Sequence, residues 1–304
     1  MFKHLEKKYL GAILVCFAAS LWGLDSIVLT PRLFKLKVPF VVFMLHFIPF
    51  ITMTLFIGKR EFKNITSLPK QDLFYFFLVA LFGGTLGTLA IVKALFLVNF
   101  QHLTVVTLLQ KAQPIFAIVL ARIILKEKIK NNFLFFALLA LIGGYIMTFE
   151  FSLPHSYDGD NIALAGMYAL FAAFAFGSST VFGKKILTNS SFITALYTRF
   201  CFTSIITFLI VLYNKQLNLI LDVTGFQWFI FIVIALTSGS MAIMIYYKGL
   251  QYITASVATI CELAFPISSV LFDYIFNKNL LTAIQSFGAI ILLFSIIKIS
   301  KSQK

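Results

Sequence analysis

Long apolar runs separated by short polar gaps dominate the chain. Ten of these runs are long enough to cross a bilayer, which requires about 20 mostly apolar residues per helix. They cover residues 9–29, 38–57, 73–95, 103–125, 132–149, 162–183, 193–213, 228–250, 254–276 and 281–299. The longest gaps, 58–72 and 150–161, are too short to fold as separate domains. The pattern therefore predicts an all-α integral membrane protein, a bundle of ten transmembrane helices.

The composition agrees with lipid as the solvent. Of the 304 residues, 60% are hydrophobic and 12% are charged, whereas an ordinary globular domain has roughly 45–50% and 25%. A net charge of +14 would suggest a nucleic-acid partner in a soluble protein. Here the basic residues lie mostly in the gaps between apolar runs, so we expect the lipid bilayer as a partner and no nucleic acid.

The basic residues also predict the orientation of the helices. Sixteen lie near the termini or in the connections after spans 2, 4, 6 and 8: Lys3, Lys7, Lys8, Lys59, Arg60, Lys63, Lys70, Lys126, Lys128, Lys130, Lys184, Lys185, Lys248, Lys298, Lys301 and Lys304. Five lie in the opposite set of connections: Arg32, Lys35, Lys37, Lys215 and Lys278. Because cytoplasmic connections carry the excess of lysine and arginine, we expect both termini to be cytoplasmic. The expected location is a bacterial inner membrane.

The second half of the chain repeats the first in three blocks. Residues 17–23 match 171–177 at an offset of 154, and residues 80–95 match 235–250 at an offset of 155. Residues 99–114 match 251–266 at an offset of 152, with a shared proline at the end. Chance similarity between apolar helices could explain one block alone. Three blocks in the same order indicate a duplication, with repeats at residues 1–155 and 156–304.

Each repeat holds five spans, which is an odd number. Two copies of an odd unit must enter the membrane from opposite sides, so the repeat has inverted topology. That architecture is typical of secondary transporters, in which the substrate binds near the bilayer midplane between the two halves.

Several short motifs recur in order along the first half. They are Trp22-Gly23 late in span 1, the small residue–leucine pair Ala94-Leu95 that closes span 3, Pro114 within span 4, and Lys126-Glu127-Lys128 after it. Their order and spacing resemble the EamA family of the drug/metabolite transporter superfamily, over roughly residues 9–298. The resemblance implies a ten-helix transporter of small metabolites that uses no ATP. The second half has Asn277-Lys278-Asn279 where the family often shows a glutamate, so we interpret Glu127 as structural.

Polar residues at bilayer depth need an explanation, since a charge there costs at least about 2.5–3.5 kcal/mol on insertion scales. Glu262 lies near the middle of span 9, four residues before Pro266. Its repeat mate is Gln110, four residues before Pro114. A proline has no N–H to donate and leaves the carbonyl four residues earlier free. Pro114 and Pro266 are therefore candidates for helix breaks or gating, with freed carbonyls at Gln110 and Glu262.

Lys111 and Gln113 flank the same site in the first half. The two proline-bearing spans thus bring a carboxylate, an ammonium and two amides to similar depth. Two interpretations stay open: a buried Lys111–Glu262 pair that links the halves, or a site for substrate or coupling ions, since midplane charges usually line a pathway. We therefore take Glu262, Lys111, Gln110 and Gln113 as candidate substrate-binding or coupling residues.

Four further residues are candidates for the same role. His46, in the middle of span 2, could relay protons near neutral pH or be a packing histidine. Arg199 could hold an anionic group of the substrate or extend to the cytoplasmic face. Asp25 lies near the outer end of span 1, where it could line a vestibule. Trp22 could stack on substrate or belong to the interfacial belt of aromatic residues.

Small residues in spans 3 and 8 suggest either close packing or motion. Gly84 and Gly239 allow helix backbones to approach closely and slide, which makes them candidates for gating. Static tight packing is the alternative.

The chemistry of soluble enzymes finds no support in the sequence. We see no Walker-type phosphate loop, no cysteine–histidine metal spacing and no nucleophile elbow. ATP-driven pumping and hydrolysis are therefore disfavoured, and no cofactor or metal is expected.

The sequence as a whole predicts a secondary active transporter that works by alternating access, as a monomer or homodimer. The expected activity is export of small metabolites such as amino acids, with proton coupling as a hypothesis. One alternative is an importer or exchanger of a nucleotide-like or cationic metabolite. Another is an intramembrane enzyme or assembly factor that uses Glu262, His46 and Lys111 as acid–base groups.

Overall fold

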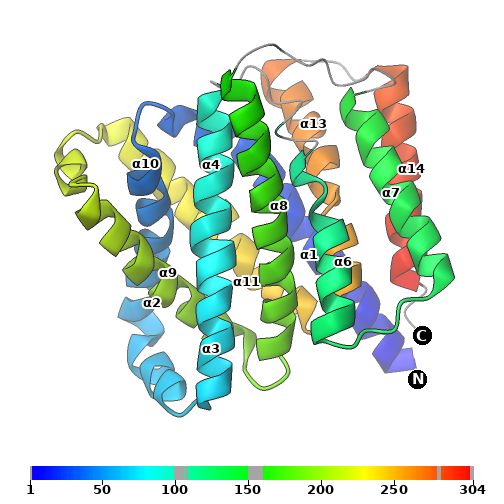
Figure 1. The fold of residues 1–304 in the computed structure, drawn as a ribbon, viewed down its shortest axis with the longest axis horizontal. Helices are drawn as coiled ribbons and strands as arrows, with labels where there is room; N and C mark the ends of the chain where they lie inside the picture. Colours follow the sequence, from blue (N-terminus) through cyan, green and yellow to red (C-terminus); the bar gives the residue numbers. More distant parts are fainter. Residues whose placement is uncertain (1, 99–105, 107–108, 150–159, 279–281, 302–304) are drawn as a thin grey trace.

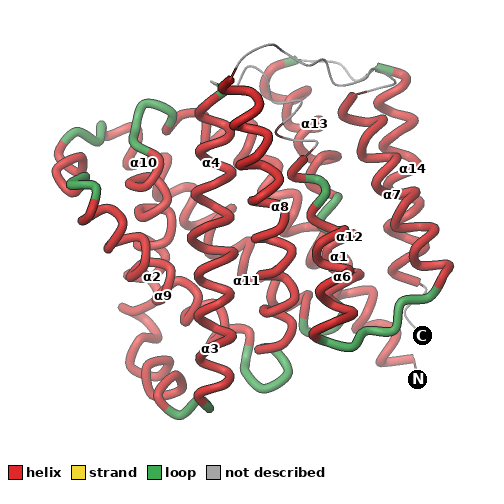
Figure 2. The backbone as a smooth tube through the Cα atoms, viewed as in Figure 1, coloured by secondary structure: helices red, strands yellow, loops and turns green. Residues whose placement is uncertain are grey.

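The computed structural model describes residues 2–98, 106, 109–149, 160–278 and 282–301. Within these ranges every regular element is a helix and no strand occurs. The helices pack side by side in a bundle (Figure 1), joined by short loops (Figure 2). The expected all-α fold is confirmed for the described part of the chain.

The first half contains three π- or 3-10-helical segments among its α-helices. Its elements are α1 (Phe2–Leu24), η1 (Asp25–Leu29), η2 (Thr30–Leu33), α2 (Val38–Thr66), α3 (Lys70–Val79), η3 (Ala80–Leu86), α4 (Gly87–Leu97), α6 (Gln113–Ile124) and α7 (Asn131–Phe149). Segments α3, η3 and α4 follow one another without a gap, so residues 70–97 form one long helix with a π-helical middle.

The second half has a similar order of elements. They are α8 (Asp160–Ile186), α9 (Phe192–Tyr213), η4 (Leu217–Leu221), α10 (Gly225–Ile234), η5 (Ala235–Gly239), α11 (Ser240–Leu250), α12 (Ala255–Cys261), α13 (Ala264–Asn277) and α14 (Ala283–Lys301). Here too a π-helical segment, η5, interrupts a long helix, residues 225–250. Because η3 and η5 begin at residues 80 and 235, which is the offset of 155 found in the sequence, both irregularities fall at matching positions of the expected repeat.

The helices are long and apolar enough for a multi-pass membrane protein. Within the described residues, eight stretches of at least 18 residues meet both criteria: Glu6–Leu33, Val38–Thr66, Lys70–Leu97, Ala163–Ile186, Phe192–Tyr213, Gly225–Leu250, Ala255–Phe276 and Ala283–Lys301. Shorter apolar helices, Gln113–Ile124 and Asn131–Met147, lie where spans 4 and 5 were expected. The count of ten spans stays a prediction. The start of α1 and the end of α14 lie at the same end of the bundle (Figure 1).

The outer surface of the bundle is apolar. Leu55 and Phe56 are 78% and 83% exposed, and many other large hydrophobic side chains face outward in the same way. Water would penalise this exposure by about 25 cal/mol per Å² of apolar surface, whereas lipid tails do not. The surface is therefore suited to hydrocarbon.

The expected end of span 2 was wrong. Instead of a connection from residue 58, α2 continues as a helix to Thr66. Lys59, Arg60 and Glu61 are strong helix formers and can continue the helix beyond the hydrocarbon. The buried carboxylate of Glu61 also accepts a hydrogen bond of 2.8 Å from Thr194 of α9, which holds the extra turns against the bundle.

The two halves of the chain interleave. Helix α1 packs on α11 and α13, α2 packs on α9, α4 and α6 pack on α8, and α7 packs on α14. Each of these contacts joins an element before residue 150 to one after residue 160. Groups from both halves therefore meet in the interior, where a central site can form.

Turns interrupt the helical backbone at two matching positions of the expected repeat. Between α12 and α13, residues 262 and 263 form a turn, and a turn at residues 111 and 112 precedes α6. The turns lie just before Pro266 and Pro114. Discontinuous helices of this kind expose backbone groups and side chains at the midplane of transporters.

Candidate functional site

Glu262 lies at the centre of a hydrogen-bonded cluster that joins both halves of the chain. Its Oε2 atom accepts a hydrogen bond of 2.6 Å from the Gln113 side-chain amide, at the start of α6. Its Oε1 atom accepts a hydrogen bond of 2.8 Å from the Tyr246 hydroxyl of α11. The Thr180 hydroxyl of α8 lies 3.3 Å from the same oxygen and 2.9 Å from the Tyr246 hydroxyl.

The helix break sets the position of this carboxylate. Glu262 is the residue at which α12 ends, and its N–H still donates to the carbonyl of Ala258, 2.9 Å away. The Glu262 carbonyl was expected to be free because of Pro266. Instead it accepts a hydrogen bond of 3.0 Å from the Phe265 N–H, because the turn tightens and supplies a donor three residues on. The backbone N–H and carbonyl of Glu262 are therefore both hydrogen-bonded within the turn, and its side-chain carboxylate is the group that contacts the neighbouring helices.

The possible Lys111–Glu262 pair does not form. The donors that reach Glu262 are Gln113, Tyr246 and Thr180, and Lys111 is not among them. Lys111 lies half-buried in the turn before α6, and the rotation of that turn directs Gln113 toward the carboxylate instead. Gln110, also half-buried, precedes the same turn.

Arg199 contacts the interior of the bundle rather than only its surface. Its Nη1 atom donates to the Tyr247 hydroxyl at 3.3 Å, and the guanidinium carbon lies 5.9 Å from the centre of the Tyr247 ring. Its Nε atom is fully buried and has no hydrogen-bond partner among the described residues. A guanidinium held in this way has donors left for a polar group of a ligand.

His46 is placed as a packing residue would be. It is buried in α2, its Nδ1 lies 2.9 Å from the carbonyl oxygen of Val42 one turn earlier, and its ring centre is 5.8 Å from that of Phe200. The short distance to a carbonyl indicates that Nδ1 carries the proton and donates it.

Trp22 faces the protein rather than the lipid–water interface. Its indole N–H donates to the carbonyl of Ser238 in η5 at 3.0 Å, and its ring centre lies 5.5 Å from that of Tyr246. Trp22 therefore connects the end of α1 to the residue that holds Glu262. Asp25 begins η1, where its Oδ1 accepts a hydrogen bond of 3.0 Å from Thr30.

The two candidate glycines differ in their surroundings. A Cβ added at Gly84, within η3, would overlap the Thr203 side chain of α9, so this glycine allows two helices to approach closely. A Cβ added at Gly239 would lie 2.9 Å from the carbonyl oxygen of Ile234, in its own helix. Gly239 thus accommodates the π-helical backbone of η5 rather than a neighbouring helix.

Thr180 and Tyr246 are the members of the cluster that were not expected from the sequence. Thr180 ends the run Ser178-Ser179-Thr180, which is buried in the middle of α8. A run of hydroxyl side chains within a span is a signal that could have pointed to it. Tyr246 stands next to Tyr247, and nothing in the sequence separates it from the other tyrosines.

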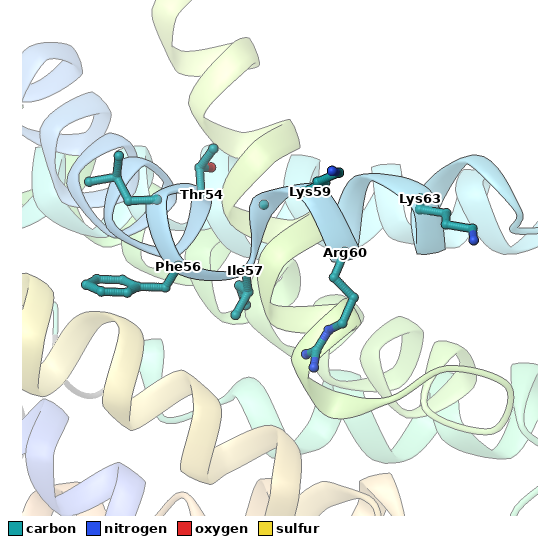
Figure 3. Close-up of a pocket in the computed structure, with 8 residues that line it drawn as sticks. Thr54, Phe56, Ile57, Lys59, Arg60 and Lys63 are labelled. Atoms are coloured by element: carbon teal, nitrogen blue, oxygen red, sulfur yellow. The ribbon is translucent and has the colours of Figure 1, made fainter.

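A hollow of about 470 Å³ lies apart from this cluster, along the last turns of α2 (Figure 3). Thr54, Lys59, Arg60 and Lys63 are among the residues that line it, and the predicted site residues are not. Among the described residues, no group of three or more His, Cys, Asp or Glu side chains is arranged to hold a metal ion.

Comparison with known proteins gives the cluster its context. A model of the EamA-like transporter family matches residues 9–149 and again residues 163–301. The chain is 62% identical over 291 residues to the Riboflavin transporter ImpX of Fusobacterium nucleatum subsp. nucleatum, an alignment that covers 96% of this chain and 97% of that one. A solved crystal structure with 12% sequence identity has a TM-score of 0.68 and covers 97% of this chain and 96% of that one, which shows a similar fold alone.

These findings confirm the resemblance noted from the sequence and support a transporter of a small metabolite, not an enzyme. They set aside the alternative of an intramembrane enzyme, because the matched family and the relative are both transporters. The chain belongs to the EamA-like transporter family.

Proposed function

We propose that this protein transports riboflavin across the bacterial inner membrane. The observation that carries the proposal is the 62% identity to a riboflavin transporter along nearly the whole of both chains. Similarity of this degree, without a large unmatched segment in either chain, leaves little room for a different substrate site. Neither amino acids as the substrate nor export as the direction has comparable support.

The chemistry of the cluster around Glu262 suits a flavin. Riboflavin combines a flat tricyclic ring, whose edge carries hydrogen-bond donors and acceptors, with a polyhydroxyl chain. Three aromatic rings lie near this cluster. The ring centre of Tyr246 lies 5.5 Å from that of Trp22 and 5.8 Å from that of Tyr247. Gln113 and Glu262 supply polar groups that can exchange their mutual hydrogen bond for bonds to a ligand.

Transport would follow from relative movement of the two repeats, residues 1–155 and 156–304. The contacts of Glu262 with Gln113 in one repeat and Tyr246 in the other cross the boundary between them. A movement of one repeat against the other would open these contacts toward each side of the membrane in turn. We propose that Glu262 binds and releases a proton during this cycle, which couples the transport to a pH gradient.

Flux measurements in proteoliposomes test the function. The purified protein should carry labelled riboflavin, and unlabelled riboflavin in excess should compete, whereas amino acids and nucleosides should not. An imposed pH gradient should drive accumulation with the wild type but not with Glu262→Gln. Flux of amino acids without flux of riboflavin would contradict the substrate. Equal accumulation with and without Glu262 would exclude this residue as the coupling site.

A further inference from the structure

Two hydroxyl groups beside Glu262 form a chain with a defined direction. An ionised carboxylate can only accept hydrogen bonds, so the Tyr246 hydroxyl, 2.8 Å away, must donate its single proton to Glu262. The Tyr246 oxygen then has lone pairs free. Thr180, whose hydroxyl oxygen lies 2.9 Å from it, can donate to those lone pairs. With charged Glu262, Tyr246 therefore donates to Glu262, and Thr180 donates either to the Tyr246 oxygen at 2.9 Å or directly to Glu262 Oε1 at 3.3 Å.

The same three groups also fit the neutral acid. A protonated Glu262 has one O–H to donate, and the Tyr246 oxygen can accept it. The Tyr246 proton can then turn to the Thr180 oxygen, which reverses the chain. The amide of Gln113 keeps its contact, because the second oxygen of a neutral carboxyl group still accepts hydrogen bonds. In both states every member of the chain has a partner, which avoids the cost of a buried unpaired polar group.

The other polar groups near Glu262 lack this property. Arg199 on α9 is always charged and bonds to the Tyr247 hydroxyl on α11. On α8, Lys184 lies one turn beyond Thr180 and donates to the carbonyls of Leu250 and Gln251.

The two remaining neighbours supply no reversible donor either. Lys111 precedes Gln113 and does not donate to Glu262. Cys261, adjacent in the chain, faces Ser300 of α14 at 3.8 Å. Gln113 contacts the other carboxylate oxygen through its amide N–H. Toward Oε1, Tyr246 and Thr180 are the hydroxyl groups, among the described residues, that can change from donor to acceptor.

We propose that Tyr246 and Thr180 are positioning residues for Glu262, a reversible hydrogen-bond chain that accommodates both its charged and its neutral form. This inference rests on the proposed role of Glu262 in coupling. It assigns to the two hydroxyl groups a function in proton-linked transport, in addition to the proposed contact of the Tyr246 ring with the transported molecule.

A measurement without substrate tests the chain directly. Trp22 and Trp228 are the two tryptophans, so in a Trp228→Phe background the emission of Trp22 reports on its neighbour Tyr246. Emission should change with pH in one step, and Glu262→Gln should remove that step. Tyr246→Phe keeps the ring next to Trp22 but should displace the midpoint of the step. Thr180→Val should displace it too, and Thr180→Ser should restore it.

Flux measurements supply the second readout. Thr180→Val should keep riboflavin exchange within about threefold of wild type and lose gradient-driven accumulation at least tenfold, because Thr180 bonds to Tyr246 and Glu262 and is not among the groups proposed to contact the flavin. Tyr197→Phe, which also removes a hydroxyl group, is the control, since the Tyr197 hydroxyl lies 3.2 Å from that of Thr54 on α2 and is not among the hydrogen-bond partners of Glu262. It should accumulate riboflavin as the wild type does.

The outcomes separate this inference from the proposed function. A wild type that carries no riboflavin overturns the proposed substrate, while the emission experiment still decides about the chain. An emission step that survives Glu262→Gln, or an unchanged midpoint in both Tyr246→Phe and Thr180→Val, overturns the chain. Equal loss of exchange and accumulation in Thr180→Val also overturns it, because a group that only shapes the site would have that effect.

Discussion

The carboxylate of Glu127 caps the N-terminus of α12 through Ser256. The Ser256 hydroxyl donates to Oε2 at 2.6 Å, its N–H donates to the same atom at 3.1 Å, and the Ala255 N–H donates to Oε1 at 2.8 Å. Glu127 lies between α6 and α7 and Ser256 lies in the second half of the chain, so this cap ties the two halves of the chain together. A carboxylate also interacts favourably with the positive end of a helix.

Loss of this cap should lower stability. We expect Glu127→Gln to lose about 1–3 kcal/mol, because hydrogen bonds to a charged acceptor are the strong ones and buried donors would lose their partner. The measurement is the thermal unfolding midpoint in detergent. Glu6→Gln, at an exposed position, is the matched control and should leave the midpoint unchanged. A midpoint for Glu127→Gln equal to that of the control would show that the cap is dispensable.

A methyl group at Gly84 should disturb packing between η3 and α9. The added Cβ would overlap Thr203, and overpacking of this kind typically costs about 1–3 kcal/mol. Gly84→Ala should therefore reduce the yield of folded protein in size-exclusion chromatography. Gly144→Ala is the control, since nothing lies within 4 Å of its added Cβ. Equal yields of the two variants would contradict the close approach of η3 to α9.

Lys111 and Glu262 should behave as independent sites. Because Lys111 does not donate to Glu262, the effects of Lys111→Met and Glu262→Gln on unfolding free energy should add to within about 0.5 kcal/mol. Gln113→Leu and Glu262→Gln should instead be coupled by about 0.5–3 kcal/mol, since their side chains meet at 2.6 Å. Rescue of the Lys111→Met variant by Glu262→Gln would mean that the pair does form in the membrane.

The orientation of the chain is a separate prediction from the charge pattern. A fluorescent reporter fused after Lys304 should mature in the cytoplasm, because the terminal connections carry the excess of basic residues. A tag inserted at Tyr157, which lies outside the described residues, should be labelled only from the external side. Labelling of that tag from the cytoplasmic side would contradict the inverted repeat.

The sequence by itself determined the fold class and the family. Apolar runs of about 20 residues are a property of local composition, and the described helices lie over those runs, although α2 continues beyond its run to Thr66. The charge at Glu262 and the prolines at 114 and 266 also stand out locally. They indicated the depth of the site and the two helix breaks without any knowledge of how the helices pack.

Only the tertiary structure decided which side chains meet. Lys111 is adjacent in sequence to Gln110, the repeat mate of Glu262, and Gln113 is three residues away, yet Gln113 is the one that contacts the carboxylate. Side chains two residues apart in an α-helix point in directions that differ by about 200°. The rotation of α6 and of its preceding turn therefore decides which of the two side chains faces Glu262. Thr180 and Tyr246 reach Glu262 from α8 and α11, whose contacts with α12 depend on packing between distant segments. The local sequence determines where each helix forms, whereas the rotation of the helix about its axis and the helices that it contacts depend on packing of the whole bundle.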